Sequence, residues 1–432
     1  MPVETTPLGV RVTPGGPAHV ATRPPGSKSL TNRALLCAAL AAGRSTIMGA
    51  STSTDAERMC AGLAALGVSC DRSNETIRVH GLGARLGADD AIIDAHDAGT
   101  VIRFLTAASC LAHSEVRLTG TARMRERPIG PLVDAMRELG AVIRYDGVEG
   151  YPPLTVFAKG LRGGQTHFAQ LNSSQYVSAT LMVAPCAMGD VFIRVEGAPS
   201  APYIDMTTRV MRAFGVELVE ENGAFVVPGP QAYCASEFEV EPDASAATYH
   251  WAAAAVTGGV ARVSGLSRNS AQGDVGFVDL LAEMGCEVIA DGDDIVVHGP
   301  KSGRLRGIDA DLNAMPDTAQ TLAIVALFAD GETRIRNTPN LRIKETDRIA
   351  AMATELTKLG AEVTTYDDGL SIQPPKKLNE ATVDSWDDHR MAMSLALVGL
   401  AGPAITIRRP ECVSKSYPGY FEAIASWTRA FA

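Results

Sequence analysis

The chain repeats one pattern six times, with a period of about 72 residues. Each copy begins with a small or acidic residue that can cap a helix, continues through a largely apolar segment, and is usually closed by glycine. Residues at one equivalent position recur at nearly constant spacing: Ser29, Thr100, Ser174, Ser245, Thr318 and His389. A short β-like run follows each segment. This recurrence predicts a fold assembled from six similar units.

A second, amphipathic helix alternates with the apolar one and usually ends in a glycine followed by a strand. These glycines keep the same period as the apolar segments: Gly67, Gly140, Gly215, Gly285 and Gly360. The sixth copy, from Tyr420, runs to the end of the chain. A helix that is apolar on every side must be buried, whereas an amphipathic helix lies outside. Each unit is therefore expected to wrap strands and an outer helix around a buried helix, which is an inside-out α/β arrangement.

Six such units account for the full length of 432 residues, and two groups of three predict two similar lobes. The Pro- and Gly-rich text at 21–28 and the EVEPD stretch at 239–243 are the candidate crossing points. The lobe boundary is then crossed twice. We therefore expect residues 1–24 and 243–432 to form lobe one, and residues 25–242 to form lobe two.

Composition excludes several classes of protein. Lys and Arg number 39 against 49 Asp and Glu, and the net charge of −10 disfavours a generic nucleic-acid binder, because phosphate backbones select basic surfaces. The apolar run Met391–Ala401 is among the longest and is too short to cross a membrane. The N-terminus lacks the apolar stretch of a secretory signal. The eight scattered cysteines are interpreted as free, buried thiols in a reducing compartment, so a cytoplasmic protein is expected.

Basic and polar residues collect where the buried helices begin. The N–H groups and partial positive charge of a helix N-terminus favour anions, and Arg and Lys bind carboxylate and phosphate groups. The residues at the helix starts are Lys28, Ser29, Arg33, Gly99, Thr100, Arg103, Ser173, Ser174, Gln175, Asp317, Asp388, His389 and Arg390. Further cations fall in loops: Arg123, Arg125, Arg127, Lys344, Arg348 and Lys415. In an acidic protein this distribution predicts a site for a small polyanion.

Each of these features also has a purely structural interpretation. Ser29, Ser174 and Asp317 could be ordinary helix N-caps. The RMRER loop could be a solvated surface loop, KETDR could be the capping box of a surface helix, and His389 with Asp388 could form a hydrogen-bonded pair. The recurrence of these residues at equivalent positions of the repeat favours a binding site.

Motifs for metals and nucleotides are missing from the sequence. The eight histidines form no HExxH pattern, and the cysteines form no CxxC pair. The glycine-rich stretches at 15–17 and 81–87 lack the strand-to-helix context and the Lys-Ser/Thr pair of a nucleotide-binding loop. We therefore expect neither a metal nor a cofactor.

Several motifs together resemble the EPSP synthase family, the 3-phosphoshikimate 1-carboxyvinyltransferases. The resemblance covers nearly the whole chain in order, and PGSKS with KETDR and DHRMAM is highly specific. The matching segments are PGSKSLTNRALLCAALA from Pro25, AGTVIR from Ala98, LTGTARMRERPIGPLVDAMRELGA from Leu118, SSQY from Ser173, PYID from Pro202, RNSAQGD from Arg268, RIKETDRIAAMATEL from Arg342 and DDHRMAMSLAL from Asp387. The resemblance implies a two-lobed inside-out α/β barrel of six βαβαββ repeats, three per lobe, with the active site in the cleft between the lobes.

The resemblance also implies transfer of the enolpyruvyl group of phosphoenolpyruvate to the 5-hydroxyl of shikimate 3-phosphate by addition and elimination, in the pathway to chorismate and aromatic amino acids. Asp317 would take the hydroxyl proton, Glu345 would protonate the methylene carbon, and Lys28 would also be catalytic. Shikimate 3-phosphate would bind Lys28, Ser29, Arg33, Ser173, Ser174, Gln175, Ser200, Tyr203, Asp317, Asn340 and Lys344. Phosphoenolpyruvate would bind Lys28, Gly99, Thr100, Arg127, Gln175, Arg348, His389, Arg390 and Lys415.

Three positions depart from the family pattern. Asp97 stands where Asn is common, and a carboxylate near two anionic substrates is unfavourable unless it points away or pairs with a cation such as Arg103. Phe104 stands where many relatives have Pro, and Pro242 stands where Gly is often found. Gly99 is retained, so we expect glyphosate to compete with phosphoenolpyruvate.

Two alternative functions are weighed against this one. The sister enzyme that transfers enolpyruvate to UDP-N-acetylglucosamine shares the fold, but it carries a loop Cys just before its Arg-Pro, and the matching loop TGTARMRERPIG has none. A non-catalytic repeat scaffold predicts an incomplete catalytic set, yet Lys28, Asp317, Glu345 and Lys415 are all present. We expect a monomer that binds two small anionic substrates and neither nucleic acid nor a membrane.

Overall fold

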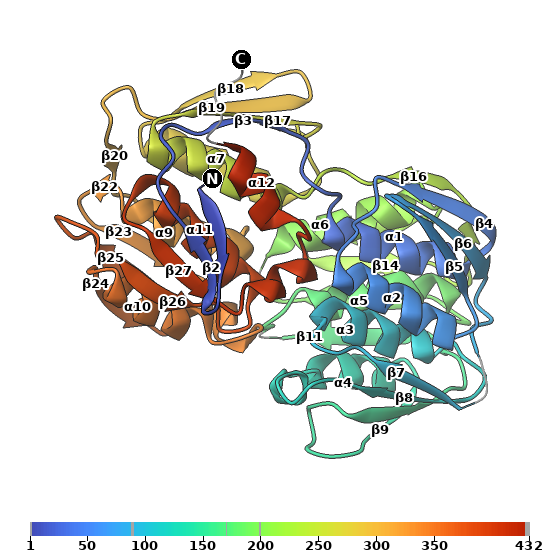
Figure 1. Ribbon diagram of the computed structural model, residues 1–432. Helices are drawn as coiled ribbons and strands as arrows, with labels where there is room; N and C mark the ends of the chain where they lie inside the picture. The colour runs from blue at the N-terminus through green and yellow to red at the C-terminus, as the bar shows by residue number, and fades with distance from the viewer. Residues whose placement is uncertain (1, 88–89, 170, 198–199, 428–432) are drawn as a thin grey trace. The chain divides into compact units, whose positions relative to one another are not determined.

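The computed structural model describes residues 2–87, 90–169, 171–197 and 200–427. The chain divides into two compact units: unit 1 comprises Met1–Pro25 with Glu241–Ala432, and unit 2 comprises Gly26–Val240. In Figure 1, unit 2 is blue to green, and unit 1 combines the first blue strands with the yellow to red part of the chain. Each unit has a hydrophobic core of its own.

Unit 2 is built around three helices formed by the apolar segments. Every residue of α3 is buried, as is every residue of α1 from Leu30 to Leu40. Because Ala, Leu and other apolar side chains cover all sides of these helices, only the centre of the unit shields them from water. The buried helices are α1 (Lys28–Leu40), α3 (Gly99–Ser109) and α5 (Gln175–Val183), and the outer helices are α2 (Thr54–Ala65), α4 (Gly130–Glu138) and α6 (Ala201–Ala213).

Each of the three sheets of unit 2 combines parallel and antiparallel pairing. In the sheet β7-β8-β10-β9, Ile93 pairs with Leu118 in parallel and Leu118 with Leu154 antiparallel, which aligns three buried side chains toward the core. The order of the second sheet is β11-β12-β14-β13, and in the third β15 and β16 pair with β4, which is followed by β6 and β5. The strands are β4 (Ala41–Met48), β5 (Ser69–Ser73), β6 (Thr76–Leu82), β7 (Ala91–Asp94), β8 (Glu115–Thr119), β9 (Val142–Tyr145), β10 (Leu154–Phe157), β11 (Gly164–Phe168), β12 (Val191–Val195), β13 (Val219–Glu221), β14 (Ala224–Val227), β15 (Tyr233–Cys234) and β16 (Glu237–Glu239).

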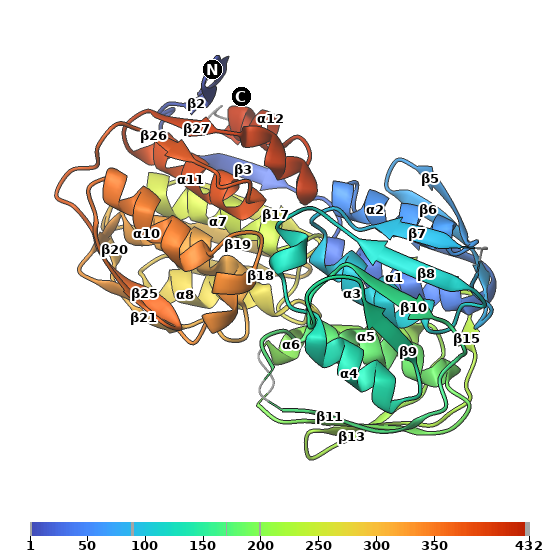
Figure 2. The ribbon, with the colours of Figure 1, turned by 90° about the horizontal axis from the view of Figure 1, so that it is seen from below.

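Unit 1 repeats this plan. Its three buried helices contact one another pairwise, and Figure 2 shows α8 and α10 at the periphery of the unit. The buried helices are α7 (Ala244–Thr257), α9 (Ala319–Ala326) and α11 (His389–Ala401), and the outer ones are α8 (Phe277–Glu283), α10 (Arg348–Lys358) and α12 (Tyr420–Trp427). The short 3-10 helices of the two units are η1 (Met124–Glu126), η2 (Ala184–Cys186), η3 (Gly273–Gly276), η4 (Pro316–Thr318), η5 (Pro339–Ile343) and η6 (Pro410–Lys415).

The N-terminal segment completes two of the sheets of unit 1. β3 pairs parallel with β17, and β2 pairs antiparallel with β27, so the first strands of the chain close sheets formed by its second half. The strand orders are β18-β19-β17-β3, β21-β23-β25-β24 and β1-β2-β27-β26, with β20 and β22 in a small sheet apart. The strands are β1 (Val3–Thr6), β2 (Gly9–Val12), β3 (His19–Thr22), β17 (Val260–Ser264), β18 (Glu287–Asp291), β19 (Asp294–His298), β20 (Leu305–Arg306), β21 (Asp309–Asp311), β22 (Ala329–Asp330), β23 (Thr333–Arg336), β24 (Glu362–Tyr366), β25 (Gly369–Gln373), β26 (Ala381–Asp384) and β27 (Ile405–Arg408).

The predicted α/β fold class of repeated strand and helix units is confirmed, but some boundaries differ. The first apolar helix ends at Leu40 rather than at the glycine that closes the segment, because Ala41 already begins β4. α5 ends at Val183, since Pro185 cannot continue a helix. The part of the sixth outer segment after Trp427 lies outside the described residues. The glycines after the outer helices all have left-handed φ angles, between 82° and 110°.

The structure bears on two predictions made from composition, that the cysteines are buried free thiols and that the apolar segments are too short to cross a membrane. All eight cysteines are free, but Cys234 is exposed and three others are only partly buried, so the interpretation of every cysteine as a buried thiol is wrong. Cys234 lies on the short strand β15, which has one face toward solvent. Among the described residues, no helix has both the length and the apolar character to cross a membrane.

Candidate active site

Arg348 is the centre of a cluster of charges in unit 1. It is the first residue of α10, whose N-terminus is capped by Asp347, and it is 1% exposed. Its guanidinium donates from Nε to Asp388 (2.7 Å), from Nη1 to Asp317 (3.0 Å) and from Nη2 to Glu345 (2.9 Å). One buried cation therefore holds three carboxylates from separate parts of the sequence.

Asp317 lies in η4, directly before α9, and contacts three cations. Besides Arg348, Arg390 donates to it at 2.8 Å, and the ammonium of Lys344 is 3.7 Å away. Burial raises the pKa of Asp317, but the charges of Arg390, Lys344 and Arg348 outweigh it and hold that pKa well below its usual range. Asp317 is therefore a carboxylate at neutral pH.

Glu345 contacts a second cation besides Arg348. The ammonium of Lys415, at the end of η6, is 3.9 Å from Glu345 Oε1, and both side chains are less than one-tenth exposed. Asn340 lies in η5 and is also buried, while Lys344 and Glu345 directly follow η5. The η5 segment thus brings one amide, one cation and one carboxylate to the charge cluster.

The residues at the start of α11 both cap the helix and belong to the charge cluster around Arg348. Asp388 caps the helix by accepting the main-chain N–H of Arg390 at 2.9 Å, while its carboxylate also binds Arg348. His389 is buried, and its Nδ1 is 3.5 Å from Asp388 Oδ1. His389 therefore lies within ion-pair distance of Asp388, and Arg348 and Arg390 contact the same carboxylate from neighbouring positions. In the neighbouring KETDR segment, the residue that caps α10 is Asp347.

Asp274 is a member of this cluster that the sequence interpretation missed. Ser245, at the start of α7, donates a short hydrogen bond to it, and Arg390 donates to Ser245 at 3.4 Å. Burial and the nearby charge of Asp317 raise the pKa of Asp274 to about 7. The residue ends the RNSAQGD motif, which was the only signal in the sequence that could have pointed to it.

Lys28 begins α1 in unit 2 and forms a buried ion pair. Its ammonium is 3.1 Å from Asp55 Oδ2, and the two side chains are 11% and 4% exposed. Asp55 belongs to the first turn of α2 and was not predicted, because nothing local marks it as the partner of a residue in the preceding helix. Ser27 caps α1, so the interpretation of Ser29 as the N-cap is wrong.

Arg33 is buried and uses its guanidinium mostly within the fold. It donates to Thr207 (2.7 Å) and Ser178 (3.3 Å), and to the main-chain oxygens of Ser29 (2.9 Å) and Tyr203 (3.1 Å). These bonds join α1 to α5 and α6. Burial lowers the pKa of Arg33 to about 10, so it remains charged at neutral pH.

Gln175 is oriented by a neighbouring arginine. Arg103 Nη1 donates to Gln175 Oε1 at 2.7 Å, and Nη2 donates to the main chain of Pro128 at 3.0 Å. Because the oxygen of the amide is engaged, its N–H groups are the ones that face any anion. Gly99 lies beside Arg103 and Arg127: a Cβ atom there would be 2.5 Å from Arg127 Nη2 and 2.8 Å from Arg103 Nη1.

The remaining predicted residues of unit 2 lie around the same helix starts. Thr100 accepts from Asn32 at 2.9 Å, and Ser173 Oγ accepts the main-chain N–H of Gln175 at 3.3 Å. Ser174 occupies the N-cap position of α5 without a side-chain capping bond. Ser200 precedes α6 in a left-handed conformation. In the RMRER loop Arg127 is 4% exposed, whereas Arg123 pairs with Glu126 near the surface.

The structure therefore gathers the predicted residues into two groups, one in each unit. Unit 1 brings together the following residues: Asp317, Asn340, Lys344, Glu345, Arg348, His389, Arg390 and Lys415. Unit 2 contains the remainder: Lys28, Ser29, Arg33, Gly99, Thr100, Arg127, Ser173, Ser174, Gln175, Ser200 and Tyr203. In the part of the chain that the structure describes, no group of three or more His, Cys, Asp or Glu side chains is placed to hold a metal ion.

Comparison with known proteins identifies the chain's relatives. Residues 12–424 match the family model for EPSP synthase (3-phosphoshikimate 1-carboxyvinyltransferase). The chain belongs to the EPSP synthase family. It is 48% identical over 410 residues to the 3-phosphoshikimate 1-carboxyvinyltransferase of Vibrio vulnificus, covering 93% of this chain and 95% of that one. The enzyme of the same name from Aeromonas salmonicida is 47% identical over 414 residues, covering 94% and 96%.

Solved structures of the EPSP synthase family have the same fold. The EPSP synthase of Acinetobacter baumannii superimposes with a TM-score of 0.81 at 28% identity, covering 96% of this chain and 97% of that one. The predictions of the family, of an enzyme and of a transferase of the shikimate pathway are confirmed. The comparisons do not favour the UDP-N-acetylglucosamine enzyme or a non-catalytic scaffold.

The departures from the pattern of the EPSP synthase family have local explanations. Asp97 Oδ1 lies 3.1 Å from His96 Nδ1, and its side chain is 33% exposed. The Phe104 ring packs 5.3 Å from the guanidinium carbon of Arg33, within a regular α3. The main-chain oxygen of Pro242 accepts from Gln272 at 2.7 Å.

Proposed function

We propose that this enzyme transfers the enolpyruvyl group of phosphoenolpyruvate to the 5-hydroxyl of shikimate 3-phosphate. Membership of the EPSP synthase family supports the reaction. The structural observation that carries it is the sharing of Arg348 by Asp317 and Glu345, at 3.0 and 2.9 Å. A base and an acid are thereby held beside several cations, as a reaction between two anions requires.

Asp317 is the proposed base. In the free enzyme its pKa is lowered by Arg390, Lys344 and Arg348 against the effect of burial. When phosphoenolpyruvate binds to Arg348 and Arg390, its negative groups take over part of these contacts. The pKa of Asp317 then rises, and Asp317 accepts the proton of the 5-hydroxyl as the oxygen bonds to C2 of phosphoenolpyruvate.

Glu345 is the proposed acid. It protonates the methylene carbon as the C–O bond forms, which gives a tetrahedral intermediate that carries a methyl group and the phosphate. Loss of a methyl proton and cleavage of the bond to phosphate then give the enolpyruvyl ether and inorganic phosphate. Lys415, 3.9 Å from Glu345, is proposed to bind phosphoenolpyruvate and to balance its charge.

Both units contribute to the proposed binding sets. Lys28 is proposed to contact both substrates, and Gln175 to donate its amide N–H groups to them. Shikimate 3-phosphate is proposed to bind Lys28, Ser29, Arg33, Ser173, Ser174, Gln175, Ser200, Tyr203, Asp317, Asn340 and Lys344. Phosphoenolpyruvate is proposed to bind Lys28, Gly99, Thr100, Arg127, Gln175, Arg348, His389, Arg390 and Lys415, and glyphosate to compete with it. We also propose that the protein is a cytoplasmic monomer and that it uses no cofactor.

Phosphate release by the purified protein tests the function. Release is expected only when shikimate 3-phosphate and phosphoenolpyruvate are both present, without added metal. Asp317→Asn and Glu345→Gln are expected to lower kcat by about 10²–10⁴-fold, the usual contribution of a general base or acid, and Lys28→Ala to raise both KM values. Arg304→Lys, at an exposed ion pair with Asp330, is the control and should retain activity. Release from phosphoenolpyruvate alone, or full activity of Asp317→Asn, would contradict the proposal.

A further inference from the structure

Glu355 is a fully buried carboxylate that the proposed mechanism does not use. It lies five residues before the glycine that follows α10. The same position in the other outer helices that precede a glycine holds Gly62, Ala135, Val210 and Leu280. Burying a charge costs free energy unless partners offset it. A carboxylate where related helices of the same chain carry apolar residues therefore points to a role beyond folding.

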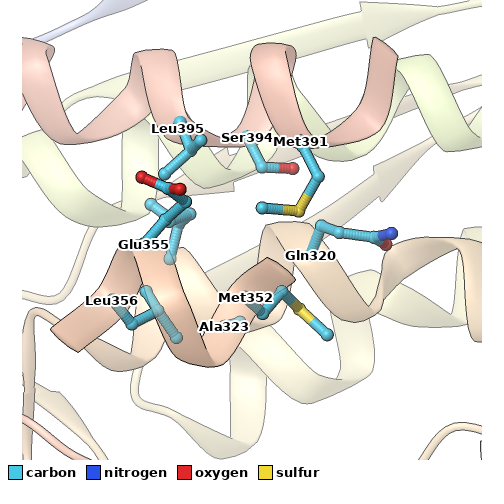
Figure 3. A pocket seen from close by; sticks show the side chains of 9 residues that line it. Gln320, Ala323, Met352, Glu355, Leu356, Met391, Ser394 and Leu395 are labelled. Atoms are coloured by element: carbon cyan, nitrogen blue, oxygen red, sulfur yellow. The ribbon is translucent and has the colours of Figure 1, made fainter. Parts of the chain in front are cut away.

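The contacts of Glu355 lead to the segment before α11. Both of its oxygens accept from the ammonium of Lys358 at 2.8 Å. Oε1 also accepts the indole N–H of Trp386 at 2.8 Å, and Oε2 accepts the main-chain N–H of Asp384 at 3.1 Å. Figure 3 shows Glu355 on the wall of a small cavity that Leu395 of α11 also lines. Glu355 thus ties α10 to both ends of the 384–386 turn.

This turn has a conformation that needs external support. Trp386 and Asp387 have φ angles of 56° and 54°, in the left-handed region that side chains with a Cβ atom disfavour. The main-chain N–H of Trp386 donates to Asp384 Oδ1 at 2.6 Å. Two consecutive residues of this kind persist only where surrounding contacts hold them. The hydrogen bonds that Glu355 accepts are such contacts, and so are the ion pairs of Arg409 with Asp384 and Asp387.

The turn leads directly to the proposed phosphoenolpyruvate ligands. Asp388 caps α11 through the N–H of Arg390, and the Arg390 side chain donates to Asp317. α10 therefore holds the 384–388 segment at two points, with Arg348 on Asp388 and Glu355 on Trp386. Residues seven positions apart lie on one face of a helix, so one face of α10 makes both contacts.

We propose that Glu355 and Trp386 are positioning residues that set the place of His389 and Arg390 for phosphoenolpyruvate. This inference rests on the proposed function, because it assumes that these two residues bind that substrate. Weakening the Glu355–Trp386 bond should relax the turn and move the start of α11. The cost should appear in the binding of phosphoenolpyruvate, while the proposed shikimate 3-phosphate ligands in unit 2 keep their places.

Trp386→Phe tests this inference, because it removes the indole N–H and keeps an aromatic ring. Trp251→Phe is the matched control: Trp251 lies in the same unit and donates its indole N–H to the main chain of Ile295 at 3.4 Å. Trp386→Phe is expected to raise KM for phosphoenolpyruvate about tenfold, the loss of one hydrogen bond to a charged group, and to change KM for shikimate 3-phosphate less than about twofold. Glu355→Gln should change each of the two KM values in the same direction as Trp386→Phe does. Trp251→Phe should leave both within about twofold.

Hydrogen exchange at the main-chain N–H of Arg390 supplies a readout that does not depend on activity. It should become about tenfold faster in Trp386→Phe and stay unchanged in Trp251→Phe. If the wild type turns over both substrates and Trp386→Phe keeps its KM and its exchange rate, the pair serves folding alone and the inference is wrong. If the wild type shows no turnover, the proposed function fails, and the exchange rates still decide whether Glu355 and Trp386 hold the turn.

Discussion

At the scale of a residue, Gly99 shows how closely the side chains around one proposed phosphoenolpyruvate ligand are packed. A Cβ atom at this position would overlap the ends of the Arg127 and Arg103 side chains rather than the main chain. The ends of long side chains can move at little cost in stability, so a substitution here acts on the site and not on the fold. The overlap joins this main-chain position to the guanidinium groups of Arg103, which orients Gln175, and of Arg127.

Gly99→Ala is therefore expected to displace Arg127 and to raise KM for phosphoenolpyruvate about tenfold, a loss of ~1.4 kcal/mol in binding. The urea midpoint of unfolding should change little. Gly130→Ala is the control, since it also alters the first residue of a helix and a Cβ atom there meets neighbours only at 3.5 Å or more. An unchanged KM in Gly99→Ala would show that Arg127 does not contact phosphoenolpyruvate.

The residues that sequence reasoning missed have one feature in common. Lys28, Asp317 and Arg348 could be predicted because each lies at a helix start within a recurring pattern or a specific motif. Asp55 and Asp274 could not, because their importance depends on the helix ends that the fold brings beside them. For the same reason the internal partners of Arg33 and the left-handed turn at Trp386 are properties of packing, which no local spacing encodes.

At the scale of the elements, buried and outer helices were predictable because the apolar pattern is local and periodic. The docking of α12 was not. His250 of α7 is fully buried, its ring centroid is 4.7 Å from that of Trp427 in α12, and its Nε2 is 3.4 Å from the Tyr417 hydroxyl. Burial lowers the pKa of His250 to about 3. A neutral histidine is thus part of the contact between these two helices.

His250 makes stability depend on pH with a definite sign. Its folded pKa of about 3 lies below its ordinary value of 6.5, so its contribution is complete above pH 6.5 and is lost as the pH falls toward 3. The raised pKa of Asp274, about 7, gives the opposite sign, because that contribution is complete at low pH and is lost as the pH rises toward 7. Both the wild type and His250→Phe keep Asp274, so the difference between them reports the contribution of the histidine alone.

Between pH 6.5 and pH 5 the wild type should lose about 2 kcal/mol of unfolding free energy relative to His250→Phe. Urea unfolding at the two pH values measures this difference. Equal losses in both proteins would mean that His250 is protonated in the folded state.

At the scale of the whole molecule, the two units differ in how they are assembled from the chain. Unit 2 takes every strand of its sheets from one continuous stretch, 26–240. Unit 1 needs β2 and β3 from the N-terminus to complete sheets with β27 and β17. The sequence predicted six similar units and grouped residues 1–24 with 243–432, whereas the strands with which the N-terminal segment pairs are defined only by the pairing register.

Fragments of the chain test this asymmetry. Residues 26–240 alone are expected to unfold cooperatively, because their sheets and core are complete. Residues 241–432 alone should aggregate or remain partly folded, since the edges of β17 and β27 are left open, and they should fold when residues 1–25 are supplied as a second chain. Circular dichroism and urea unfolding measure both outcomes. Cooperative unfolding of 241–432 by itself would contradict the expectation.

The pairing of the N-terminal strands with strands from the second half of the chain has a consequence during synthesis on the ribosome. The segment 1–25 emerges before unit 2, whereas its partners β17 and β27 are translated after unit 2. Unit 2 can complete its sheets while unit 1 is still being synthesised. The N-terminal segment therefore remains unpaired until all of unit 2 has been made. The strands VETT and GVRV place charged residues among β-forming Val and Thr. Charges in unpaired strands disfavour premature pairing with other nascent chains.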